Sequence, residues 1–144
     1  MQNWIKLTIG ITASVIILLI AGGYIFYYML RTSLPQYEGE LNSTSIKNEI
    51  KIYRDSHAIP YIIADSDEDA AFALGYVHAQ ERLFSMDIAR RAASGRLSEI
   101  FGEKTIPLDK MFLTMGIKDI AYENLKRTNE DVKKILHSYA DGVN

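Results

Sequence analysis

The 144-residue sequence contains no cysteine and only three histidines. Without cysteine it offers no disulfide, no cysteine-ligated zinc site, no thiol nucleophile and no lipidated amino-terminal cysteine. A zinc-protease motif needs two histidines that converge from one helix face, whereas His57, His78 and His137 lie far apart. No Gly-x-Ser-x-Gly segment is present to suggest a serine hydrolase elbow. These absences leave no motif for catalysis that the chain carries by itself.

Positive charge is also sparse. The formal net charge is −2, and the part beyond residue 31 is more acidic than the whole, because Lys6 and Arg31 both lie outside it. No stripe of Lys and Arg marks a surface for DNA or RNA, so we exclude nucleic acid as a partner.

An uncharged run is the most prominent feature that is present. Residues 7–30 read LTIGITASVIILLIAGGYIFYYML. As a helix this run is roughly 36 Å long, enough to cross a hydrocarbon core of about 30 Å. A cleaved signal peptide is the alternative, but its apolar region is shorter and ends in small residues. Here Ala21, Gly22 and Gly23 are followed by further apolar residues. We therefore predict a single transmembrane anchor at 7–30, after a short segment 1–6, with the lipid bilayer as its partner.

The orientation of this anchor rests on few charges. Lys6 and the free amino group stand before it, Arg31 follows it, and the next cation is Lys47. The positive-inside rule slightly favours a cytoplasmic amino terminus. We expect a single-pass membrane protein whose domain lies outside the cytoplasm.

Beyond the anchor, residues 31–45 are polar, contain Pro35 and Gly39, and predict a tether. Residues 49–55 alternate apolar and polar side chains, which indicates a strand. The turn SHAIP and the β-rich run 61–65 follow, so we predict a hairpin. A two-stranded hairpin is marginal by itself, and the strand signals end there. The remaining strands must come from other polypeptide.

The rest of the sequence predicts helices. The first begins at Asp65, Ser66 or Asp67 as its cap and stops at Ser94-Gly95. A short piece ends at Gly102, a longer helix runs from Pro107 to residue 127, and a capping box starts the last at Thr128. The first helix has apolar side chains at helical spacing, namely Ala70, Leu74, Val77, Phe84 and Ile88. We interpret the acids at its start, Asp65, Asp67, Glu68 and Asp69, as solvated capping residues.

A polar cluster interrupts this apolar helix at His78, Gln80, Glu81 and Arg82. A metal site or a catalytic centre is one interpretation. The other is a hydrogen-bonded network that fastens the helix to loops of a larger protein, with the Arg82 guanidinium tying acceptors together. His78 and Arg82 share one helix face, as do Asp87 and Arg91. We favour the structural interpretation.

The same residues resemble the amino-terminal part of the penicillin acylase family. The resemblance covers residues 50–144. Its pattern comprises Arg54-Asp55, Ile59-Pro60, Gly75-Tyr76-Val77-His78-Ala79-Gln80, Arg82-Leu83-Phe84, Met86-Asp87, Arg90-Arg91, Gly95 and the closing YADGVN. Two positions depart from it: Ala58 stands where the family often has Gly, and Tyr61 where it often has His. Both concern the geometry of the turn or the fit of substrate.

The resemblance implies an amidohydrolase whose precursor cuts itself into two chains and whose new terminal serine attacks an amide carbonyl. Family substrates include penicillins, other β-lactams and acyl-homoserine lactones, and many members bind calcium. The fold class implied is α+β, a fragment of the αββα N-terminal-nucleophile hydrolase fold. Residues 46–144 are then a partial domain, truncated at its carboxyl end. The serine, the oxyanion donors and the calcium ligands fall after Asn144, so we assign no catalytic, cofactor-binding or metal residue here.

Two functions remain open from the sequence. The first is the amino-terminal fragment of a membrane-anchored, penicillin acylase-like enzyme, inactive alone, whose partner is the missing remainder of the precursor and whose substrate is a small amide. The alternative is a non-enzymatic, membrane-anchored interaction module or a decayed gene product.

Overall fold

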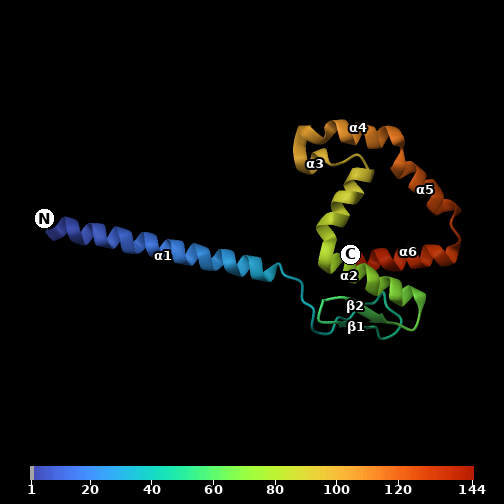
Figure 1. The fold of residues 1–144 in the computed structure, drawn as a ribbon, viewed down its shortest axis with the longest axis horizontal. Coiled ribbons are helices and arrows are strands. Elements are labelled where there is room, and N and C mark those ends of the chain that lie inside the picture. The colour runs from blue at the N-terminus through green and yellow to red at the C-terminus, as the bar shows by residue number, and fades with distance from the viewer. Residues whose placement is uncertain (1) are drawn as a thin grey trace. The chain divides into compact units, whose positions relative to one another are not determined.

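The computed structural model describes residues 2–144, except for the side chains of residues 2, 3, 5, 7 and 8. The chain divides into two compact units, one ending at Glu40 and the other spanning Leu41–Asn144 (Figure 1).

The first unit contains one long helix, α1 (Gln2–Thr32), and the residues that follow it, 33–40, lie outside helices and strands. The predicted apolar run 7–30 lies within it. Its stretch Ile9–Thr32 is long and apolar enough to cross a membrane by length and composition, a test that a signal sequence near the amino terminus also passes. The described apolar side chains, such as Ile17, Leu19 and Phe26, are exposed. An apolar helix with no polar face favours lipid over water as its surroundings.

The second unit begins with the predicted hairpin. Strands β1 (Lys51–Arg54) and β2 (Pro60–Ile63) pair antiparallel, with Ile52 opposite Ile62 and Tyr53 opposite Tyr61. The Asp55 carboxylate holds the turn by accepting the amide hydrogens of His57 and Ile59, both at 2.8 Å. Ala58 sits in this turn at φ +62°, the left-handed region that favours glycine. The departure from the family pattern at Ala58 therefore falls where the backbone geometry prefers Gly.

Helix α2 (Asp67–Ala93) carries the polar cluster. Ser66 caps it by accepting the Asp69 amide hydrogen, as predicted, and Gly95 ends it at φ +63°. The backbone is non-helical at Arg82 (φ −147°, ψ 31°), which kinks the helix. Of the predicted apolar positions, Val77 is buried, whereas Leu74 before the kink and Phe84 after it are 41% and 70% exposed.

Four short helical elements follow α2. They are α3 (Ser98–Phe101), the 3-10 turn η1 (Gly102–Thr105), α4 (Ile106–Met115) and α5 (Ile117–Arg127). The single helix predicted from Pro107 to residue 127 was wrong. Gly116 adopts φ +66° and separates it into α4 and α5, because a left-handed residue cannot continue the helical hydrogen-bond ladder.

The last helix, α6 (Glu130–Val143), starts one residue later than predicted. Its cap is Asn129, whose side chain accepts the Val132 amide hydrogen at 2.8 Å, and not Thr128. The Thr128 hydroxyl instead donates to the Asn124 carbonyl at the end of α5. The Thr128 side chain therefore bonds to the end of α5 and does not cap α6.

Helix α6 packs chiefly on the first half of α2 (Figure 1). The two backbones touch at glycines. A Cβ added at Gly75 would overlap the Tyr139 carbonyl oxygen, and one added at Gly142 would overlap the Phe72 carbonyl oxygen. The buried apolar core of the described chain is small, comprising Phe72, Ala73, Val77 and Leu97.

Candidate functional site

The polar cluster on α2 joins three segments that are distant in sequence. His78 Nδ1 lies 3.0 Å from the Tyr139 hydroxyl of α6, and the two rings meet edge to face with centroids 5.9 Å apart. Arg54 of β1 donates to the Gln80 side-chain carbonyl at 3.1 Å. The cluster therefore connects α2 to both the hairpin and α6.

Arg54 has the role that the sequence pattern suggested for Arg82. Its side chain is only 13% exposed and also forms an ion pair with Glu81 at 3.4 Å. The Gln80 amide nitrogen donates in turn to the Tyr76 hydroxyl at 3.0 Å. Arg82 is exposed and lies at the kink, so it does not share a regular helix face with His78. That part of the prediction was wrong, since it assumed a straight helix.

Sequence reasoning missed Arg54, Tyr76 and Tyr139 as members of this network. Arg54, Tyr76 and Tyr139 (the first residue of the closing YADGVN) all belong to the family pattern, so the pattern was the signal that could have found them. Tyr139 lies 61 residues from His78, and no local spacing indicates such a contact.

A buried polar group lies at the start of α2. Asp69 is 2% exposed, which corrects its interpretation as a solvated capping acid. Its carboxylate accepts hydrogen bonds from the Lys47 amide at 3.0 Å, the Asn48 side chain at 3.2 Å and the Ser66 hydroxyl at 2.8 Å. Lys47 also forms an ion pair with Glu68. We call this arrangement the Asp69 clamp, since it fastens the segment before β1 to α2.

The bonds of the clamp favour the charged form of the carboxyl. The Lys47 amide, followed by the Ser66 hydroxyl, lowers the pKa of Asp69 below its ordinary value of 3.8 despite its burial. Asp69 is thus a permanently charged structural group near neutral pH.

The end of α2 carries ion pairs that brace α3. Arg91 bonds Asp87 at 2.7 Å, as the sequence spacing predicted, and reaches Glu99 of α3 at 2.6 Å. Arg96 also bonds Glu99, at 2.7 Å. The hydrogen bond from Arg91, then that from Arg90, lowers the pKa of Asp87.

Asp109 of α4 closes this region. It is 4% exposed and accepts the amide hydrogens of Leu97 and Ser98, both at 2.8 Å, at the start of α3. Burial raises the pKa of Asp109, but the bonds from Ser98 and Leu97 together outweigh it, so the net shift is downward.

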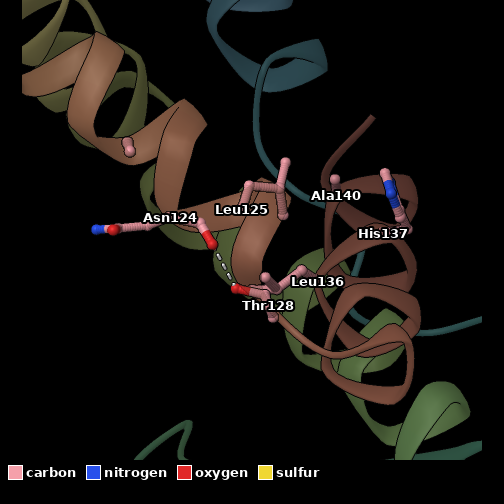
Figure 2. A pocket seen from close by; sticks show the side chains of 7 residues that line it. Asn124, Leu125, Thr128, Leu136, His137 and Ala140 are labelled. Atoms are coloured by element: carbon pink, nitrogen blue, oxygen red, sulfur yellow. Dashed lines mark hydrogen bonds between the residues drawn. The ribbon is translucent and has the colours of Figure 1, made fainter.

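A shallow apolar groove lies between α5 and α6 (Figure 2). Its volume is about 550 Å³, and Leu125, Leu136 and Ala140 contribute apolar surface. His137, one of the three histidines, lines its side, without a second titratable side chain among its lining residues. The groove has no arrangement of nucleophile and base.

The described residues contain no group of three or more His, Asp or Glu side chains that could hold a metal ion. His57 is exposed in the hairpin turn, 3.3 Å from the Ser56 hydroxyl. The three histidines do not converge.

Comparison with known protein families identifies the chain. The family model for penicillin amidase matches residues 49–144. The chain is 34% identical over 115 residues to penicillin acylase 2 proenzyme of Pseudomonas sp. (strain SE83), covering 80% of this chain and 15% of that protein. It is 33% identical over 112 residues to acyl-homoserine lactone acylase QuiP of Pseudomonas fluorescens (strain Pf0-1), covering 78% of this chain and 14% of that protein. The chain belongs to the penicillin amidase family.

A solved structure of a penicillin acylase is similar in fold to this chain. A thermostable penicillin G acylase from Alcaligenes faecalis superposes with a TM-score of 0.60 and 28% identity, over 66% of this chain and 51% of that chain. The described fold, mostly helical with a short hairpin and one apolar helix, therefore has penicillin G acylase as a structural neighbour. The chain spans only about a seventh of the length of the sequence relatives named above.

Proposed function

We propose that this chain is the amino-terminal scaffold of a membrane-anchored amidohydrolase. The complete enzyme cleaves an acyl amide of the β-lactam side-chain or acyl-homoserine lactone type. The nucleophile is a terminal serine on polypeptide outside these residues, and its own amine serves as base. The observation that carries this proposal is the family match over residues 49–144. The names of the relatives support the substrate classes.

The bonding of the polar cluster supports a scaffolding role. His78, Gln80 and Glu81 each have a partner on another segment of the protein. Hydrogen bonds to partners on other segments fix the position of a helix, and removal of one partner leaves the other without its bond. The cluster thus holds α2, the hairpin and α6 in one geometry.

The surface of the second unit supports a large missing partner. Tyr53, Tyr61, Ile63, Leu83 and Phe84 are all exposed on the hairpin and on α2. Large apolar surfaces in soluble proteins mark places where other polypeptide packs. We propose that the remainder of the precursor covers them and adds strands to the hairpin, giving the αββα fold of N-terminal-nucleophile hydrolases.

The same proposal includes the cellular location of the enzyme and the position of any bound calcium. The apolar helix α1 anchors the enzyme, with its domain outside the cytoplasm. Calcium, where the complete enzyme uses it, is bound by residues outside this chain.

A segment exchange tests the scaffolding role. Residues 49–144 replace the matching segment of Escherichia coli penicillin G acylase, to which this chain is 35% identical over 97 residues. We expect the chimera to hydrolyse a chromogenic phenylacetyl anilide, and the purified chain alone to show no turnover. Turnover by the chain alone that disappears on substitution of one of its own residues would overturn the proposal.

Variants of the chimera separate scaffold from catalyst. His78→Gln removes the ring contact with Tyr139, so it lowers the yield of active enzyme, while the kcat per titrated serine stays unchanged. His57→Gln, the matched control at an exposed position, changes neither quantity. A lower kcat per titrated serine in His78→Gln would place His78 in the chemistry instead.

The alternative function, a non-enzymatic interaction module, predicts a different result for the chimera. It requires the chimera to be inactive, and it also requires the chain beyond the anchor to be monomeric and folded by itself.

A further inference from the structure

A segment that crosses the boundary between the two units, at Glu40 and Leu41, has a distinct chemical character. Helix α1 closes with bonds from the Ser33 and Leu34 amides to the carbonyls of Leu30 and Arg31. The Asp69 clamp fastens the chain again at Lys47. The residues between them, 35–46, lie outside helices and strands, and we call them the linker.

The linker is accessible. Nine of its twelve residues are exposed, the others being half-buried. Tyr37 and Leu41 are 51% and 61% exposed although they are large and apolar. Gly39, at φ +128° with open space where a Cβ would stand, interrupts any regular structure between them. Proteases act on exposed segments of this kind, because the substrate must lie extended in their active sites.

The composition of the linker selects the class of protease. No Lys or Arg occurs between Arg31 and Lys47, so trypsin-like enzymes have no site within it. The flanking cation Lys47 is held by the clamp through its amide and by Glu68 through its side chain. Bulky apolar side chains are available instead, at Tyr37 and Leu41.

We propose that the linker is a processing site, cut after Tyr37 or Leu41 by an endoprotease that prefers a bulky apolar residue before the broken bond. Water adds across the peptide C–N bond, giving a new carboxylate on the anchor side and a new amino terminus at Glu38 or Asn42. The cut separates the second unit from α1, and the Asp69 clamp protects the chain from Lys47 onward. This processing does not depend on the amidohydrolase function proposed above.

Limited proteolysis of the full chain in phosphatidylcholine nanodiscs tests the accessibility. We expect chymotrypsin to release a soluble fragment that begins at Glu38 or Asn42, and trypsin to cut after Lys47 about tenfold more slowly. Asp69→Asn weakens the clamp and accelerates the tryptic cut after Lys47. First cuts within residues 48–144, or no soluble fragment, would overturn the proposal.

Expression of the full chain with a carboxyl-terminal epitope tests the processing itself. Replacement of Tyr37 and Leu41 by Asp removes both apolar sites and lowers the soluble, tagged fragment about tenfold or more. Glu38→Gln with Glu40→Gln, the matched control, alters the same segment but keeps both sites and the release. Equal release from both double variants, a fragment that begins elsewhere, or wholly membrane-bound wild-type chain would contradict the assignment.

Discussion

Ala58 is held in a conformation that costs free energy for any residue with a Cβ. Its φ of +62° lies in the left-handed region, where glycine has no steric penalty. We expect Ala58→Gly to raise the free energy of unfolding by about 1 kcal/mol. Urea unfolding of the full chain in detergent, followed by far-ultraviolet circular dichroism, measures the change.

Ala64 supplies the control for this prediction. It follows β2 and is not among the described residues with positive φ. Ala64→Gly adds freedom to the unfolded chain without relieving strain, so it should destabilise slightly. The same sign for both substitutions would refute the strain at Ala58.

Asp69 makes stability depend on pH in a defined direction. Because its pKa is lowered on folding, its contribution is fully present above the ordinary pKa of 3.8 and is lost as the pH falls toward the folded value. We expect Asp69→Asn to be less stable at pH 7 and to show a flatter loss of stability below pH 4, by urea midpoints across pH. Parallel pH profiles for the two proteins would contradict the charged clamp.

At the scale of elements, the α2–α6 contact depends on two glycines. A methyl group at Gly142 would overlap the Phe72 carbonyl, so the helices must separate to accept it. We expect Gly142→Ala and Gly75→Ala each to destabilise by about 3 kcal/mol. Gly22→Ala in α1, where nothing lies within 4 Å, serves as control and should leave unfolding of the second unit unchanged. Full retention of stability in Gly142→Ala would mean that the helices do not approach so closely.

Local signals predicted the elements well where residues act on their own neighbours. Alternation indicated the hairpin, and Ser66 and Gly95 indicated the ends of α2. The predictions failed where backbone geometry overrode spacing. The left-handed Gly116 divided one expected helix, and the kink at Arg82 took that side chain off the helix face of His78.

The candidate site was predictable only in part. Its members on α2 stand out, because polar residues interrupt an apolar helix. Their partners Arg54 and Tyr139 come from segments 26 and 61 residues away. Such pairs depend on the tertiary fold, which local periodicity does not encode. The same limit explains why Asp69 resembled an ordinary solvated cap.

At the scale of the whole molecule, the absence of cysteine allows a direct test of membrane topology. A single cysteine at Ser45→Cys, in the predicted tether, should react in intact cells with a maleimide that cannot cross membranes. A single cysteine at Gln2→Cys should react only after the cells are opened. The reverse pattern would place the domain in the cytoplasm. If the product lacked residues 1–30 and none of it were bound to the membrane, the apolar run would be a cleaved signal sequence.

The pairing of α2 with α6 also has a consequence for synthesis. The backbone of Phe72 contacts Gly142, which is translated about 70 residues later. At about 5–20 residues per second, the delay between the two is on the order of 4–14 s. During that interval Val77 and its neighbours have no helix to cover them. A nascent chain stalled before Ser138 should therefore recruit chaperones at α2, whereas one extended past Asn144 should release them.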